Sequence, residues 1–162
     1  PRPATNENRP APVDASKGYF TVPSAEELAA MDADGLCGVE DFVVGRTGFG
    51  SIKWPGLTDV RSLALDTIVE ILDNEVAVYT GEWEARKPCV GVALNKPAEV
   101  TLLGVWPEEH VVESGPPASP LTPAAVHQHE EELRGYCKAN TGVEFVSYSA
   151  GGGEWVFRVP HF

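Results

Sequence analysis

Three kinds of feature are scarce in this sequence, and each scarcity excludes a class of protein. Only 3 of the 162 residues are cysteines, and Cys37, Cys89 and Cys137 stand far apart without a C-x-x-C pair. Neither a disulfide framework nor a zinc site is therefore indicated. No apolar run approaches the roughly 18–20 residues that span a bilayer, so we expect no membrane insertion. The composition, with 43% hydrophobic and 22% charged residues, is that of a globular domain.

Basic residues are also scarce. The chain has 12 lysines and arginines against 24 aspartates and glutamates, a net charge of −12 and an isoelectric point near 4.6. This average field repels a phosphate backbone, and the sequence shows no local basic patch that would overcome it. We therefore expect no direct nucleic-acid binding, and basic or apolar protein partners fit better.

Candidate chemistry is sparse as well. The stretch "HQHEEE" offers His127, His129 and Glu130, but positions i and i+2 of a helix point away from each other, so one face cannot present both imidazoles to a metal. The glycines at 151–153 are followed by neither a lysine nor a helix, so they indicate a hairpin turn rather than a phosphate loop. There is no G-x-S-x-G nucleophile motif. We expect no metal and no cofactor.

The last stretch, "GEWVFRVPHF", has the period of a strand with one face in a core. Trp155, Phe157 and Val159 alternate with the intervening residues up to the apolar Phe162. Chain termini are usually polar and frayed, and here the only methionine is Met31. We expect the chain to be a piece of a longer protein, cut or truncated after Phe162, with its last residues ordered in the sheet.

The rest of the chain predicts one domain after a linker. Residues 1–17 are rich in Pro, Asn and charge, which indicates a flexible linker. Ser24 and Glu27 form a capping box that opens a short helix, and Thr122-Pro123 opens a longer one in which Val126, Leu133 and Cys137 share a face. The expected strands are 39–45, 51–54, a hairpin at 67–79 turning at Asp73-Asn74, 90–94, 98–106, 143–148 and 153–162. The predicted fold class for 18–162 is mainly β with flanking helices (α+β), a β-sandwich-like antiparallel domain capped by two helices.

Six stretches carry a resemblance to a known family. They are "GYFTVPSAEELAAM", "VEDFVVGRTGFGSI", "LALDTIVEI", "EVAVY", "VGVALNKPAEVTLLGVWP" and "EWVFRVPHF". In order and spacing they resemble the autoproteolytic (peptidase S59-like) C-terminal domain of the nucleoporin 98 family, from about Gly18 to Phe162. The resemblance is specific because six separate stretches agree in one order.

The resemblance implies a component of the nuclear pore complex in the nuclear envelope. It implies a domain that follows Phe-Gly repeats and a linker, and that anchors those repeats by docking to scaffold nucleoporins. It also implies one self-cleavage after a His-Phe pair, immediately before a serine. His161 and Phe162 stand where that pair is expected, so His161 is the candidate catalytic residue and Phe162 supplies the carbonyl at the cleavage site.

The chemistry of such a cut can be argued from the residues alone. Amide resonance gives the peptide bond a rotation barrier of about 18–20 kcal/mol, so an uncatalysed cut needs help. A hydroxyl on the residue after Phe162 could attack the Phe162 carbonyl and shift the acyl group from nitrogen to oxygen, and water would then hydrolyse the ester. His161 could act as base or as proton donor to the leaving amine. The alternative is that His161 only orders the strand end.

The resemblance also implies partners at two places. The groove at the cleavage site would bind the amino-terminal tail of a nucleoporin 96-like protein or the released segment. In the family a lysine after the Trp-Pro pair docks on a β-propeller nucleoporin (nucleoporin 88/82-like). In this chain that loop reads "WPEEHVVESG", which puts the lysine contact in doubt. The candidate partner-binding residues are Trp155, Phe157, His161, Phe162, Glu108, Glu109 and His110.

Two functions of different classes remain open, a self-processing peptidase and a docking module. Because the nucleophile is the residue after Phe162, this chain would be the inactive product, and docking would be its only activity. A third reading is a non-catalytic β-sandwich module for peptide, adhesion or sugar binding, truncated at Phe162.

Overall fold

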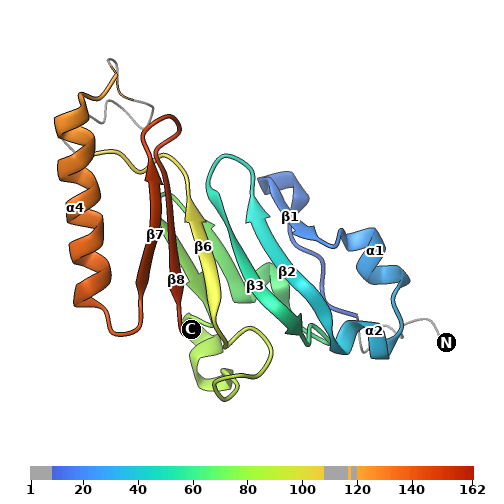
Figure 1. Ribbon diagram of the computed structural model, residues 1–162. Coiled ribbons are helices and arrows are strands. Elements are labelled where there is room, and N and C mark those ends of the chain that lie inside the picture. Colours follow the sequence, from blue (N-terminus) through green and yellow to red (C-terminus); the bar gives the residue numbers. More distant parts are fainter. Residues whose placement is uncertain (1–8, 108–116, 118–119) are drawn as a thin grey trace.

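The computed structural model describes residues 9–107, 117 and 120–162. Its main feature is an antiparallel sheet of six strands in the order β1-β2-β3-β6-β8-β7 (Figure 1). These strands are β1 (Tyr19–Val22), β2 (Val39–Arg46), β3 (Gly50–Thr58), β6 (Ala98–Leu102), β7 (Glu144–Ser149) and β8 (Glu154–Val159). The expected antiparallel β fold with helices is confirmed.

A second sheet and the helices complete the fold. The hairpin β4 (Val69–Leu72) and β5 (Glu75–Val78) turns at Asp73-Asn74, as expected. The helical elements are η1 (Ala15–Lys17), α1 (Ala25–Ala30), α2 (Ala33–Cys37), α3 (Leu65–Ile68), η2 (Gly81–Arg86) and α4 (Pro123–Ala139). The described residues thus contain four α-helices, of which α1 and α4 begin at the two caps that the sequence predicts. The other two are only 5 and 4 residues long, too short for a periodic signal.

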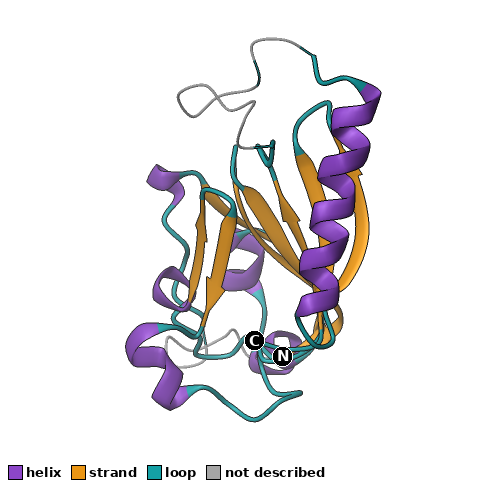
Figure 2. Cartoon of the chain, turned by 90° about the vertical axis from the view of Figure 1, so that its left-hand side faces the viewer, coloured by secondary structure: helices purple, strands orange, loops and turns teal. Residues whose placement is uncertain are grey.

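The core lies on one face of the six-stranded sheet. Alternate residues on the central strands are buried there: Phe42 and Val44, Ile52 and Trp54, Val100 and Leu102, Trp155 and Phe157. The β4–β5 hairpin and α4 cover this face, and Figure 2 shows α4 in front of the strands. The opposite face carries charge, with Arg158 paired to Glu99 at 3.3 Å. The two layers explain the sandwich-like reading of the sequence.

Helix α4 packs through a face that differs in part from the predicted one. Leu133 and Cys137 are buried as expected, but the third buried residue is His129, whereas Val126 is only half-buried. The edge of the Tyr136 ring meets the Trp155 ring at a centroid distance of 5.7 Å. The helix therefore closes the β7–β8 end of the core.

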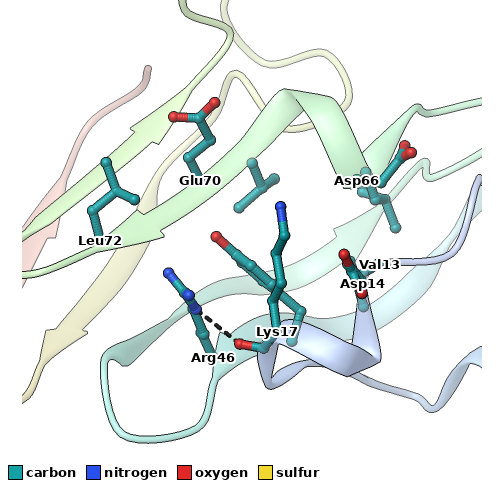
Figure 3. Close-up of a pocket in the computed structure, with 10 residues that line it drawn as sticks. Val13, Asp14, Lys17, Arg46, Asp66, Glu70 and Leu72 are labelled. Carbon is teal, nitrogen blue, oxygen red and sulfur yellow. Dashed lines mark hydrogen bonds between the residues drawn. The ribbon is translucent and has the colours of Figure 1, made fainter.

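The outer edge of β4 is capped by side chains. The Tyr19 hydroxyl accepts a hydrogen bond from the Ile71 N–H at 3.0 Å and lies 3.3 Å from the Ile71 carbonyl. Arg46 Nη1 donates to the same carbonyl at 2.9 Å, and its Nε donates to the Lys17 carbonyl at 3.0 Å (Figure 3). These bonds occupy backbone groups that would otherwise be an open strand edge.

Replacing Tyr19 by Phe should therefore destabilise the domain. The change leaves the Ile71 N–H without its partner, which costs about 1–3 kcal/mol of unfolding free energy. Urea denaturation measures this loss. Tyr136→Phe, at a tyrosine whose side chain is 56% exposed, is the matched control and should change stability by less than about 0.5 kcal/mol. Equal effects of the two substitutions would contradict the capping role.

The Val105 backbone is held from three sides. Its N–H donates to the Gly153 carbonyl at 2.8 Å, and its carbonyl accepts from the Tyr148 hydroxyl at 2.6 Å. His129 Nε2 lies 3.3 Å from the same carbonyl. Gly153 has φ +61°, and a Cβ there would approach the Val105 nitrogen to 2.7 Å, so the turn at 151–153 requires glycine at that position. The glycines thus form the expected turn and fix the chain just before residue 108.

The half-buried Tyr148 side chain gives a pH-dependent prediction. Burial raises the pKa of Tyr148 to about 12, above the value of 10 for a free tyrosine. Between these values the unfolded chain loses a proton that the folded chain keeps, so the unfolding free energy falls as the pH rises. Urea denaturation from pH 9 to 11.5 should show this fall, and Tyr148→Phe should make it shallower. Tyr136→Phe should leave the slope as it is, and an unchanged slope in Tyr148→Phe would refute the assignment.

Part of the expected linker packs against the domain. Pro10 is buried, and the Ala11 N–H donates to the Leu63 carbonyl at 2.8 Å. Asp14 caps η1, which leads directly into β1. A linker ending at residue 17 is therefore wrong for residues 10–17, because prolines and small residues can line a surface without forming a periodic element.

The expected strand at 90–94 is also wrong. This segment turns, with Gly91 at φ +95° and Ala93 at φ +51°, and Val90 and Val92 are 62% and 52% exposed. Its hydrogen bonds are local, including Asn95 N–H to the Val92 carbonyl at 3.0 Å. Valine enrichment predicted a strand here, but the left-handed residues break the extended path.

Candidate functional site

The end of β8 is the first element of the site. Residues 155–159 are ordered in the sheet as expected, where they pair with β6, and the last pair is Ala98 with Val159. The strand stops at Val159 rather than continuing to Phe162. Pro160 lacks an N–H and cannot extend the ladder, which explains the early end. His161 and Phe162 therefore lie just past the end of β8, where side chains can hold them.

The Phe162 side chain packs on the core. Its ring lies 5.9 Å from the ring of Trp54, tilted by 54°. Trp54 is fully buried, and its other neighbour Phe42 stacks at 5.9 Å. The Trp54 indole N–H donates to the Leu94 carbonyl at 3.0 Å. Phe162 is thus seated on an aromatic side chain that cannot move without disturbing the core.

The Phe162 backbone is held as well. Its N–H donates to the Asn95 Oδ1 atom at 2.9 Å, a contact between residues 67 apart in the sequence. Asn95 is 2% exposed and belongs to the turn that replaces the expected strand at 90–94. Contacts therefore hold both the ring and the N–H of Phe162. The carbonyl of the same residue is the group expected to react.

His161 differs from its neighbour because its side chain is exposed. Lys96, next to Asn95, donates from Nζ to the Leu57 carbonyl at 2.6 Å and to the Thr58 hydroxyl at 2.9 Å. Burial lowers the pKa of the Lys96 ammonium. This ammonium is held by its two hydrogen bonds at the end of β3. The His161 imidazole is thus exposed and directly precedes the residue whose carbonyl is expected to react, a position compatible with the expected acid–base role.

Trp155 and Phe157 do not lie at this place. Both are 7% exposed, and their rings meet at 4.4 Å within the core below α4. Trp155 is at the far end of β8, about 23 Å along an extended chain from Phe162. Their expected role as surface contacts in a groove is therefore corrected, since buried rings support the sheet and offer no surface to a partner.

The second expected partner site lies outside the described residues. Glu108, Glu109 and His110 belong to the part of the chain that the structure leaves undescribed. In the described part, His127 is exposed, whereas His129 is buried against the Val105 carbonyl, so the two imidazoles do not share a site. The described residues as a whole contain no cluster of three or more potential metal ligands. They also contain no helix with the length and apolarity needed to cross a membrane.

A charged cavity of about 620 Å³ lies elsewhere, beside β4. Its lining includes Lys17 and Asp14 from the η1 side and Asp66 and Glu70 from the α3–β4 side, with Arg46 bonded to the Lys17 carbonyl (Figure 3). None of the residues at the end of β8 lines this cavity, and Arg46 donates its hydrogen bonds to the Lys17 and Ile71 backbone carbonyls. The cavity therefore belongs to the packing of η1 against the hairpin rather than to the candidate site.

Sequence reasoning missed the two residues that hold Phe162. Trp54 was expected only as part of a strand, and Asn95 was placed in no site. One signal was present in the sequence, because a lone asparagine stands between the apolar Leu94 and the start of β6. Its partner is 67 residues away, and a local pattern cannot identify such a contact.

Comparison with known proteins gives consistent matches. The family described as Nup98-96 autopeptidase S59 matches residues 16–162. The nuclear pore complex protein NUP98A of Arabidopsis thaliana is 46% identical over 147 residues, covering 89% of this chain and 13% of that protein. Nup98-Nup96 of Dictyostelium discoideum is 39% identical over 159 residues, covering 96% of this chain and 7% of that protein.

Solved structures agree on the fold. The crystal structure of the Chaetomium thermophilum Nup145N APD T994A mutant fused to Nup145C N has 30% identity and a TM-score of 0.74, covering 89% of this chain and 94% of that one. A chain of the yeast heterotrimeric Nup82-Nup159-Nup116 nucleoporin complex has 24% identity and a TM-score of 0.71, covering 97% of this chain and 98% of that one, and shows the fold alone.

The chain spans only 13% and 7% of the length of these two curated relatives. The family match covers residues 16–162, which is nearly all of the described domain. Both relatives are nuclear pore complex proteins. This chain belongs to the Nup98-96 autopeptidase S59 family of nuclear pore proteins.

Proposed function

We propose that this domain cleaves the chain once, directly after Phe162, when a residue with a side-chain hydroxyl follows, and then docks short nucleoporin segments at the same place. The observation that carries the proposal is the seat of Phe162. Its ring rests on Trp54 and its N–H is bonded to Asn95, while the preceding His161 is exposed. Fixed orientation of a reacting group is a main source of catalytic rate.

The cleavage would proceed in two steps. The hydroxyl oxygen of the next residue attacks the Phe162 carbonyl carbon, the carbon–nitrogen bond breaks, and the acyl group is left on oxygen as an ester. His161 takes the hydroxyl proton and returns a proton to the leaving amine. Water then hydrolyses the ester, which gives the Phe162 carboxylate and restores the hydroxyl. No metal or cofactor is needed for the balance of these steps.

The proposed docking takes place at the same end of β8. The segment after β8 has left the ladder, so backbone groups near Phe162 are available to an extended peptide. One solved neighbour supports a docking role by analogy, since it is a nucleoporin domain fused to Nup145C N. The occupant would be the released segment or the tail of a nucleoporin 96-like protein. Contact of Glu108, Glu109 and His110 with a β-propeller nucleoporin remains a further proposal, as does anchoring of Phe-Gly repeats.

The cleavage can be tested in a chain extended past Phe162 by a serine and several further residues. The extended chain should cut itself during expression, and mass spectrometry should find Phe162 as the new end. His161→Ala should slow the cut by about 10²–10⁴-fold, the usual reach of acid–base catalysis. His127→Ala, at an exposed imidazole on α4, is the matched control and should cut at the normal rate. An intact precursor with His161 and serine both present would refute the proposal.

Docking can be tested by titrating the ¹⁵N-labelled chain with a peptide that begins at the residue after the cut. Chemical shifts should change at His161, Phe162 and the Asn95 side-chain amide, and not at the exposed Tyr136 on α4. The affinity should depend only modestly on salt, because the contact is mainly backbone and apolar. Shift changes confined to α4 would mean that the docking surface lies elsewhere and that the end of β8 serves cleavage alone.

A further inference from the structure

The geometry points to Asn95 as a positioning residue for the cleavage: its side-chain oxygen accepts the Phe162 N–H and fixes the orientation of the carbonyl that is attacked. This inference rests on the proposed function. The contact is 2.9 Å long, and it joins the half-buried Phe162 to Asn95, which is 2% exposed, so the bond is partly shielded from water. A shielded bond of this kind is stronger than the same bond at the surface.

The sheet itself cannot supply this acceptor. Val159 pairs with Ala98 in the last step of the ladder, so the next pair in register would be Pro160 with Pro97. Neither proline has an N–H, and the ladder ends there. Two steps further, the same register places Asn95 opposite Phe162. The Asn95 side chain thus takes over from the backbone at the point where pairing has stopped.

The backbone of Asn95 is already used by its turn. Its N–H donates to the Val92 carbonyl at 3.0 Å, and its carbonyl accepts from the Gly91 N–H at 2.6 Å. The side-chain Nδ2 donates to the Pro88 carbonyl at 2.7 Å. Only Oδ1 remains, and it receives the Phe162 N–H.

These partners also fix which way the amide points. The Pro88 carbonyl can only accept and the Phe162 N–H can only donate, so Nδ2 must face the first and Oδ1 the second. The site therefore needs one donor and one acceptor on a short planar group. This requirement distinguishes asparagine from leucine, which has neither, and from aspartate, whose carboxylate accepts but does not donate.

Leu94, which precedes Asn95, is also held by hydrogen bonds. The Leu94 N–H donates to the Tyr79 hydroxyl at 3.3 Å, and the Leu94 carbonyl accepts from the Trp54 indole at 3.0 Å. Trp54 also carries the Phe162 ring. The amide and the ring of Phe162 are therefore fixed by two residues of one connected unit. With both substituents fixed, the position of the carbonyl depends on a single remaining backbone rotation.

The effect on cleavage follows from this constraint. Without the Asn95 acceptor the Phe162 amide is free to turn, and the carbonyl leaves the line of attack. A misplacement of about 1 Å can cost on the order of 10²-fold in rate. Asn95→Leu should therefore slow cleavage of the serine-extended chain by about 10²-fold or more. Asn95→Asp keeps the acceptor for the Phe162 N–H but loses the donor to the Pro88 carbonyl, so it should cut more slowly than the unsubstituted chain and at least about 10-fold faster than Asn95→Leu.

The matched control is Asn140→Leu. Asn140 is exposed, and its Nδ2 bonds the Tyr136 carbonyl at 2.8 Å, so the same substitution removes a similar bond away from the site. This variant should cut at the normal rate. Circular dichroism and thermal unfolding show which variants are folded.

A second measurement does not depend on cleavage. In the chain ending at Phe162, hydrogen exchange of the Phe162 amide, followed by NMR, should be slowed at least about 10-fold relative to an unprotected amide. Asn95→Leu should abolish this protection, and Asn95→Asp should retain it. A purely structural role for the bond to Pro88 would instead impair both variants alike.

The outcomes separate the two proposals. If the extended chain with Asn95 does not cut, the proposed function fails, and the exchange result alone judges the Phe162 contact. If it cuts and folded Asn95→Leu cuts within about 3-fold of it, the positioning role is overturned. If Asn95→Leu does not fold, Asn95→Asp decides: retained cleavage supports the role, and a loss of about 10²-fold with the Phe162 amide still protected overturns it.

Discussion

The structure depends on how Trp54 is buried. Its ring lies between Phe42 and Phe162, each at 5.9 Å, and its indole N–H reaches the Leu94 carbonyl at 3.0 Å. One side chain thereby joins the central hairpin of the sheet, the turn before β6 and the last residue of the chain. A buried tryptophan removes a large apolar area from water and needs a partner for its N–H. The turn that provides this partner is the turn that carries Asn95.

Local signals in the sequence were sufficient where an element is determined by its own residues. The alternation of Trp155, Phe157 and Val159 predicted β8, and Asp73-Asn74 predicted the β4–β5 turn. The caps at Ser24 and Thr122 predicted the starts of α1 and α4. In each case the determining side chains lie within a few residues of one another, so periodicity and cap chemistry describe the interaction that forms the element.

The sequence predictions failed where contacts between residues distant in the sequence determine the structure. The valines at 90 and 92 suggested a strand, but the segment turns because its polar groups bond to one another and to Tyr79 and Trp54. His161 and Phe162 were identified by resemblance, which indicated the cut but not what holds it. Asn95 could not be identified before the pairing of β6 with β8 was known, because only that register brings it opposite Phe162.

The two prolines at the end of the ladder have a consequence for the rate at which a severed segment departs. Pro97 and Pro160 stand where the next pair would form, so the β6–β8 ladder ends before His161 and Phe162. Under the proposed function, a cut after Phe162 would fall beyond the last pair of this ladder, so no pair between β6 and β8 would have to open. The residence time of a docked segment would then be set by its own contacts, over timescales far shorter than those of global unfolding. Such a domain would exchange one docked segment for another while its core stays closed.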